Sequence, residues 1–144
     1  MLYPIGIQNF EKMRTGGFVY VDKTAQIYKL AATGSYYFLS RPRRFGKSLL
    51  VSTMEAYFQG RKELFKGLAI EKLEKNWTAS PVLHLDLTGS RYTSLADLAG
   101  KFDQHLLAWE SQFGVTDRFE EPAARFAAVI EAAYRKVGNG VVIL

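Results

Sequence analysis

Residues 36–50 read YYFLSRPRRFGKSLL, an apolar segment that a basic turn joins to a second apolar run. In phosphate-binding loops of the pattern Gly-x-x-x-x-Gly-Lys-Ser/Thr, backbone N–H groups surround phosphate oxygens, the lysine contacts the outer phosphates and the hydroxyl binds Mg²⁺. Gly46, Lys47 and Ser48 fit the end of this pattern, whereas Arg41 stands where its first glycine belongs. The turn therefore predicts a phosphate site with one departure from the pattern.

The departure at Arg41 is compatible with phosphate binding. A residue before proline is restricted to extended conformations, so Arg41 can continue a strand while Pro42 turns the chain. At Gly46 a phosphate can approach the backbone closely, because no Cβ intrudes there. The predicted nucleotide-binding residues are Arg43, Arg44, Phe45, Gly46, Lys47, Ser48 and Leu49. Of these, Lys47 is also predicted to be the catalytic lysine and Ser48 the Mg²⁺ ligand.

The hydrophobic pattern around the turn predicts strands that alternate with helices. Residues 35–40 are nearly all apolar, which is typical of a strand covered on both faces. Further strand-like segments lie at 16–21, 81–89 and 141–144, and three-and-four spacing predicts helices over 23–33, 47–58, 95–113 and 123–137, joined by a helix-rich connection at 61–77. This alternation argues for an α/β layer fold with a mainly parallel sheet.

In such a fold the basic turn joins the C-terminal end of a strand to the N-terminus of a helix. This is the edge at which α/β proteins bind ligands and at which helix N-termini hold anions. Two helix starts are also predicted from side chains that precede them. Asp22 is expected to cap the helix over 23–33, and Ser94 with Asp97 resembles a capping box for the helix over 95–113.

The length, composition and net charge of the chain limit the classes of protein to which it can belong. The 144 residues suffice for one domain, or a piece of one, whose core needs no covalent staples. Cysteine is absent, which excludes disulfides and thiolate metal sites and favours a cytoplasmic location. We expect no signal peptide and no membrane partner, because no suitable apolar run is present. The net charge of +5 permits polyanion binding without demanding it.

Two alternatives stay open at this stage. The basic cluster of Arg41, Arg43 and Arg44 also suits the phosphates of a nucleic acid, in a binding or assembly module whose phosphate loop is vestigial. Asp86, at the end of the strand-like segment 81–89, is either an acid that helps to hold Mg²⁺ or a carboxylate that caps nearby backbone groups. The capping role is favoured, because Leu87 follows it and leaves no paired acid.

The motifs YVDKT at residues 20–24 and RPRRFGKSL at residues 41–49 resemble the AAA-ATPase-like family of bacterial and archaeal proteins. The resemblance covers essentially the whole chain. Related archaeal-type ATPases carry Gly-Pro-Arg-Arg-x-Gly-Lys-Ser/Thr at this loop, so that Arg41 alone departs, and arginine is the norm there in the family itself. The resemblance implies a three-layer P-loop ATPase fold with ATP and Mg²⁺ as ligands. Asp22, Lys23 and Thr24 match a motif of the family, which implies a place near the nucleotide, while an ordinary helix start is an almost equally good interpretation of them.

The resemblance also implies how the chain is organised. Residues 1–144 resemble the N-terminal part of the ATPase domain, with a strand and helix segment over 1–34 and the phosphate-loop core over 35–144. Residues 141–144 resemble the start of the Walker B strand, after which an acidic pair should follow. Hydrolysis needs those acids, so we expect weak nucleotide binding and no useful turnover from residues 1–144.

ATP hydrolysis is then an expectation for a longer parent protein, which in this family often carries a C-terminal nuclease-like domain. A strand that usually lies between the phosphate-loop strand and the Walker B strand is also missing from residues 1–144. An apolar slot with open strand edges should remain, and we expect repacking or self-association across it.

Overall fold

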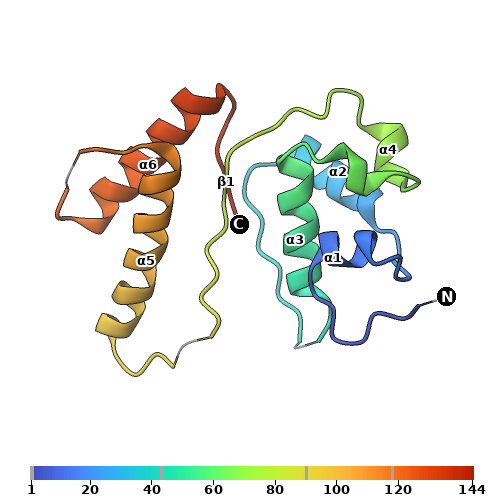
Figure 1. The fold of residues 1–144 in the computed structure, drawn as a ribbon, viewed down its shortest axis with the longest axis horizontal. Helices are drawn as coiled ribbons and strands as arrows, with labels where there is room; N and C mark the ends of the chain where they lie inside the picture. The colour runs from blue at the N-terminus through green and yellow to red at the C-terminus, as the bar shows by residue number, and fades with distance from the viewer. Residues whose placement is uncertain (1, 43, 90, 118) are drawn as a thin grey trace. The chain divides into compact units, whose positions relative to one another are not determined.

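The computed structural model describes residues 2–42, 44–89, 91–117 and 119–144. The chain divides into two compact units, Met1–Ala79 and Ser80–Leu144, and each contains a hydrophobic core of its own. Figure 1 shows helices α1 to α4 in the first unit and helices α5 and α6 in the second. The expected division of an ATPase domain at residue 34 stays a prediction.

The first unit is helical. Its elements are α1 (Phe10–Thr15), α2 (Thr24–Thr33), α3 (Lys47–Phe58), the 3-10 helix η1 (Lys62–Phe65) and α4 (Ala69–Leu73). The helices predicted over 23–33 and 47–58 are confirmed, as is the helix-rich connection that follows them. The periodicity predicts no helix at α1, which is short, although Asn9 begins it by accepting a hydrogen bond from the Lys12 N–H at 2.9 Å.

Aromatic side chains from distant segments form the core of this unit. Phe10 and Phe65 are fully buried, with ring centroids 4.8 Å apart, and Trp77 packs on Phe65 at 5.2 Å. Ile27 of α2 and Ile70 of α4 belong to the same cluster, and α3 joins it as well. The core therefore holds both helices that border the basic turn.

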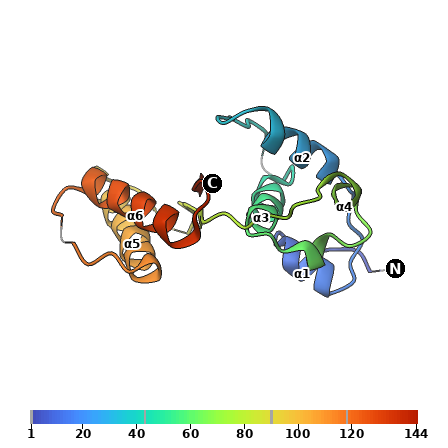
Figure 2. The same ribbon diagram turned by 90° about the horizontal axis from the view of Figure 1, so that it is seen from above.

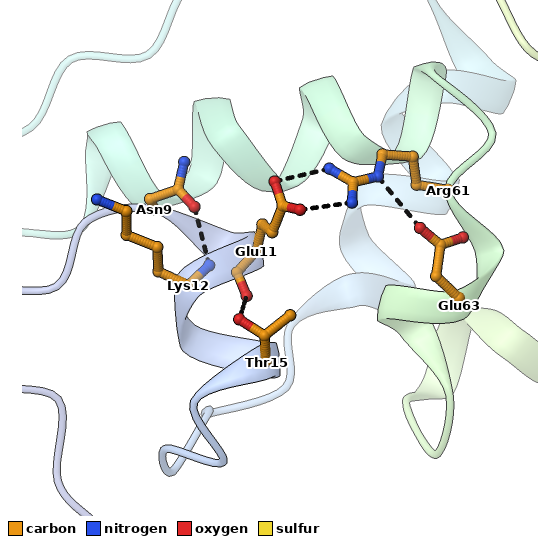
Figure 3. A network of polar contacts seen from close by, with 6 residues as sticks. All are labelled: Asn9, Glu11, Lys12, Thr15, Arg61 and Glu63. Atoms are coloured by element: carbon orange, nitrogen blue, oxygen red, sulfur yellow. Dashed lines mark hydrogen bonds and ion pairs between the residues drawn. The ribbon is translucent and has the colours of Figure 1, made fainter.

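A polar network on the surface joins α1 to the segment around η1 (Figure 3). Arg61 donates hydrogen bonds of 2.7 and 2.6 Å to the two oxygens of the Glu11 carboxylate, and a third of 3.1 Å to Glu63. The pair of Arg61 and Glu11 thus joins two residues that are 50 positions apart in the chain. Exposed ion pairs contribute little to stability, so the aromatic core remains the main support of α1.

The strand predicted at residues 35–40 is wrong. Figure 1 draws the chain between α2 and α3 as coil, and its side chains are exposed, by 97% at Tyr36 and 93% at Phe38. A strand needs partners for its N–H and C=O groups. In the described part of this unit the strand-like pairing is confined to an isolated parallel bridge between Leu2 and Phe18, which leaves residues 35–40 without a partner strand.

The second unit contains a parallel pair of strands and the two helices that connect them. Its elements are β1 (Val82–Leu83), α5 (Leu95–Phe113), α6 (Pro122–Val137) and β2 (Val142–Ile143). Val82 pairs with Val142 and Leu83 with Ile143. The strand predicted at 81–89 is confirmed only near its start, at Val82 and Leu83, and the strand predicted at 141–144 is confirmed at its two central residues. Ile143 of β2 is 52% exposed, because the described sheet has only two strands.

Helices α5 and α6 lie side by side (Figure 2) and enclose the core of this unit. Leu106, Trp109 and Val129 are buried together with Leu83 of β1. Next to this core, Arg125 of α6 donates hydrogen bonds of 2.7 and 2.9 Å to the Glu110 carboxylate of α5 and also pairs with Asp103. The hydrogen bonds from Arg125 hold the pKa of Glu110 below its usual value against the opposing effect of burial.

The apolar face predicted for the helix over 95–113 is buried only along its later turns. That face comprises Leu95, Leu98, Phe102, Leu106, Trp109 and Phe113. Leu95 is 84% exposed and Leu98 is also exposed. The ring of Phe126 contacts that of Phe102, with centroids 5.7 Å apart, and the buried positions of α5 follow from there.

The described residues thus form a mixed α/β structure with one small parallel sheet. This confirms the coarse expectation of helices combined with parallel strands, while the three-layer P-loop topology stays a prediction. None of the described helices combines the length and the apolar character that a bilayer span requires.

Candidate phosphate-binding site

The basic turn before α3 has a backbone of alternating handedness. Arg44 has a φ of 68° and Gly46 a φ of 75°, whereas Phe45 between them and the helical Lys47 have negative φ. Anion-binding concavities known as nests consist of alternating left-handed and right-handed residues, and the left-handed Gly46 followed by the helical Lys47 fits that pattern. Because a residue other than glycine costs on the order of 1 kcal/mol or more at positive φ, Arg44 adopts this conformation against its local preference.

Gly46 is required by its backbone conformation rather than by crowding. A Cβ atom at this position would meet no protein atom within 4 Å, but a φ of 75° disfavours any other residue. The space beside the Gly46 backbone is therefore open. A ligand that approaches the peptide groups of the turn needs this open space.

Lys47, Ser48 and Leu49 form the first turn of α3, and no side chain in the described part of the chain caps this helix start. The Lys47 Nζ donates a hydrogen bond of 2.6 Å to the carbonyl oxygen of Arg41 and so closes the turn. The side chains of Lys47 and Ser48 are exposed. The structure brings residues 44–49 of the predicted site together in one turn, and the predicted Arg43 lies outside the described residues.

A cavity of about 420 Å³ lies next to this turn, within the first unit. Arg41, Gly46 and Lys47 line it on the side of the turn. Its other walls come from α2, from residues 19–21 and from α3, and they include Lys23, Gln26, Ile27, Leu30, Leu50 and Thr53. A cavity of this size, mostly apolar with a few polar groups, is typical of small-molecule sites. The sequence indicated the turn but not this cavity.

Asp22 joins the start of α2 to the start of α4. Its Oδ1 accepts hydrogen bonds from the Thr24 N–H at 2.8 Å and the Thr24 hydroxyl at 2.7 Å, and its Oδ2 accepts one from the Ala69 N–H at 2.7 Å. The buried Thr24 hydroxyl also accepts a hydrogen bond of 3.1 Å from the Ile70 N–H. One carboxylate therefore serves the starts of two helices. We call Asp22 and Thr24 the α2–α4 clamp.

The charge of Asp22 follows from these contacts. Burial tends to raise the pKa of Asp22, but hydrogen bonds from Thr24 and from the Ala69 N–H outweigh it and hold the pKa below its usual value. The N-cap position of α2 is Lys23, which makes no capping hydrogen bond, so the prediction of Asp22 at that position is wrong by one residue; from there its side chain still accepts a hydrogen bond from the first N–H of the helix, at Thr24. Its contact with α4 carries no local sequence signal, because Ala69 lies 47 residues away.

The second unit holds the other candidate acid. The Asp86 Oδ1 accepts a hydrogen bond of 2.8 Å from the Thr88 N–H, and the hydrogen bonds from Thr88 lower the pKa of Asp86. This confirms the favoured interpretation that Asp86 caps nearby backbone. Within the described ranges, no group of three or more histidine, aspartate or glutamate side chains is arranged to hold a metal ion.

Comparison with known proteins gives one family. Residues 4–144 match the model of a family described as "Predicted AAA-ATPase". Over 143 residues the chain is 41% identical to an uncharacterized protein in the vnfD 5′ region of Azotobacter chroococcum mcd 1, with 98% of this chain and 28% of that protein covered. The chain therefore spans less than a third of that relative's length. No solved structure matches the chain.

Proposed function

Because the chain belongs to the predicted AAA-ATPase family, we propose that residues 1–144 form the nucleotide-binding part of a cytoplasmic P-loop ATPase. The proposed ligand is ATP with Mg²⁺, and its phosphates bind at residues 44–49. The observation that carries the proposal is the backbone of alternating handedness through Arg44, Phe45 and Gly46, directly before a helix that begins with a lysine.

Three features of the turn favour a phosphate ligand. The left-handed Gly46 before the helical Lys47 has the backbone pattern of an anion-binding nest, and the uncapped start of α3 adds the positive end of its helix dipole. Lys47 is a cation at a helix start, where the dipole disfavours it unless an anion is present. In the proposed complex Lys47 contacts the outer phosphates, which is the reason to name it as the catalytic lysine.

The metal has one protein ligand in this proposal. Mg²⁺ keeps several waters and is usually held by one or two protein oxygens together with substrate phosphates. The exposed Ser48 hydroxyl in the first turn of α3 suits that role. Hydrolysis also requires an acid near the metal and a group that orients water. We propose that other parts of a longer ATPase supply these groups, because residues 44–49 do not.

Calorimetric titration of MgATP into the 144-residue chain tests this function. We expect saturable binding that Lys47→Ala weakens by about 100-fold, or about 2.8 kcal/mol, without a change in the unfolding temperature. Gly46→Val should also remove binding, because valine does not tolerate a φ near 75°. Lys12→Ala, which removes a lysine from α1, is the matched control. Equal affinities for the Lys47→Ala and Lys12→Ala chains contradict the proposal.

A second function is favoured by one observation. Phe45 is 62% exposed next to the exposed Arg44, and aromatic rings flanked by arginines stack on the bases of single-stranded nucleic acids. This alternative predicts binding that falls steeply with salt and that is more sensitive to Arg41→Ala and Arg44→Ala than to Lys47→Ala. The same variants, titrated with an oligonucleotide, separate the two functions.

A further inference from the structure

We propose that the outer surface of residues 61–76 binds double-stranded nucleic acid through the phosphate backbone of the duplex. Four exposed lysines carry this surface, which we call the lysine surface: Lys62, Lys66, Lys72 and Lys75. The inference goes beyond the proposed function. It concerns another part of the first unit and another ligand, and it does not depend on the phosphate turn.

The positive charge of the chain belongs to its first unit. Residues 1–79 contain thirteen lysines and arginines against six aspartates and glutamates, a net charge of +7, whereas residues 80–144 contain six against eight, a net charge of −2. Such asymmetry between two parts of a chain indicates a polyanionic partner, nucleic acid above all. The basic turn holds only four of the thirteen cations, Arg41, Arg43, Arg44 and Lys47, so most of them lie elsewhere.

The core of the first unit fixes the segment that carries the lysine surface. Residues 61–76 include the short helices η1 and α4. Their apolar side chains are buried in the core, namely Leu64, Phe65, Leu68 and Ile70. The four lysines stand between and after these anchors in the sequence and are all exposed. Because the anchors hold the backbone, the lysines extend from a rigid base, which lowers the entropy lost when a ligand orders them.

The acidic side chains of the same segment do not pair with these lysines. Glu63 pairs with Arg61, and Glu71 accepts a hydrogen bond of 2.7 Å from a backbone N–H of its own segment. Glu74 accepts a hydrogen bond of 2.6 Å from the Tyr57 hydroxyl. No ion pair engages the four ammonium groups within residues 2–42, 44–89, 91–117 and 119–144. They are therefore available to an external anion.

Arg14 of α1 adds a fixed cation to this surface. Its Nε donates a hydrogen bond of 2.8 Å to the carbonyl oxygen of Leu64, and its Nη2 donates one of 2.6 Å to that of Lys66. These bonds join α1 to the end of η1. The guanidinium group is thereby held against the backbone of Lys66, so that two positive charges lie close together there.

Helix α3 separates the lysine surface from the phosphate turn. Lys47 begins α3, which has 12 residues, and Lys62 follows soon after its last residue, Phe58. At a rise of about 1.5 Å per residue, the two ends of such a helix are about 18 Å apart. A nucleotide at the turn therefore leaves Lys62 and the lysines that follow it unoccupied.

The side chains on this surface suit the backbone of a duplex better than exposed bases. Lysine is a point charge on a flexible stem, and a duplex presents a dense row of phosphates to such cations. Single-stranded nucleic acid is held by aromatic rings on which its bases stack. Phe65 is the sole aromatic residue of 61–76, and it is fully buried. The lysine surface therefore differs from the turn, where Phe45 is exposed, and we expect it to bind without sequence preference.

Fluorescence anisotropy with short labelled DNA and RNA duplexes tests the surface on the 144-residue chain. If each of the four lysines neutralises one phosphate, the logarithm of the association constant should fall with the logarithm of salt concentration with a slope of about −3.6. A triple variant with Lys62→Ala, Lys66→Ala and Lys72→Ala should reduce this slope by about 3 and weaken binding at least about tenfold at low salt. Replacement of the same lysines by arginine should preserve binding.

A matched triple variant removes the same charge elsewhere. Lys29→Ala, Arg91→Ala and Lys101→Ala change the net charge equally, and these residues lie outside residues 61–76. This variant should keep duplex affinity within about threefold. Circular dichroism should show that both triple variants are folded. MgATP affinity should stay within about twofold in the Lys62, Lys66 and Lys72 variant, because the phosphate turn is intact.

The outcomes separate this inference from the proposed function. Equal losses of duplex affinity in the two triple variants overturn the lysine surface, because net charge alone would explain them. A larger loss in Arg41→Ala and Arg44→Ala also overturns it and assigns the duplex to the turn. Polyglutamate that binds as tightly as the duplex overturns it in favour of an acidic protein. In each case MgATP binding reports independently on the phosphate turn, so the proposed function stands or fails by itself.

Discussion

Helices α3 and α5 begin in opposite ways. At α5 the Ser94 hydroxyl accepts a hydrogen bond of 3.2 Å from the Asp97 N–H, and the Asp97 carboxylate accepts bonds from the Ser94 and Thr93 N–H groups at 2.9 and 2.8 Å. At α3 no described side chain caps the helix, and a left-handed Gly46 precedes a lysine. The start of α5 is satisfied by its own carboxylate, whereas that of α3 is left to an external partner.

The difference shows how a helix start can be assigned to stability or to binding. A helix leaves its first N–H groups without intrahelical partners, and a protein either caps them or leaves them exposed. Capping serves the fold of the helix itself. An exposed start surrounded by cations, as at α3, has a preference for anions that the fold does not satisfy.

A carboxylate placed at the start of α3 should make this helix start resemble that of α5. Of the changes considered, it should have the largest effect on MgATP affinity. Gly46→Asp gives α3 the kind of group that α5 has, and aspartate tolerates left-handed backbone better than most residues. We expect MgATP affinity to fall at least about 100-fold by calorimetry, since the carboxylate repels phosphate and occupies its place. Gly46→Asn is the isosteric control without the charge. Equal losses in the two variants would assign the effect to the Cβ atom instead of the charge.

Removing the cap of α5 should have a smaller effect, and on stability alone. Ser94→Ala leaves the Asp97 N–H without its hydrogen bond, and such a loss at a helix start costs about 1 kcal/mol. Urea titration followed by circular dichroism should report this loss. MgATP affinity should not change. A weakened ligand affinity in Ser94→Ala would mean that the two helix starts are not functionally separate.

A third helix start, that of α2, is held by Asp22. Removing the charge of Asp22 should have the smallest effect, which is a change in the pH dependence of stability under acidic conditions. Because the pKa of Asp22 lies below the usual value of 3.8, its carboxylate stabilises the folded chain fully above pH 3.8, and this contribution is lost as the pH falls through the lowered pKa. Asp22→Asn has no such proton to gain. The difference in Tm between the unaltered and Asp22→Asn chains should therefore stay constant at neutral pH and narrow as the pH falls below 3.8. A constant difference would contradict the role of the charge.

The helices could be predicted from the sequence because their signals are local. Ser94 and Asp97 lie three positions apart, and Lys47 to Phe58 keep helical spacing over three turns. The phosphate turn was likewise indicated by adjacent residues. Its alternating handedness was not, because the left-handed conformation of Arg44 is not a preference of arginine and depends on the surrounding chain.

Structural features that depend on residues far apart in the chain could not be predicted from the local sequence pattern. The apolar residues 35–40 predict a strand, but a strand exists only where another segment supplies hydrogen bonds, and the described part of the first unit supplies none for them. The clamp from Asp22 to Ala69 and the cavity walls also join segments far apart in the chain. The family match agrees with the resemblance that the loop and the YVDKT motif indicated.

The exposed segment of residues 36–39 has a consequence for solubility. Tyr-Tyr-Phe-Leu combines high β-propensity with no charge, the composition from which steric zippers form when copies of a chain stack. Arg41 and Pro42 follow after Ser40 and are suited to act as gatekeepers, because charge repulsion and a missing N–H donor both oppose stacking. We therefore expect the same basic turn that is suited to phosphate to oppose aggregation of concentrated chains, and salts that screen its charge should weaken this effect.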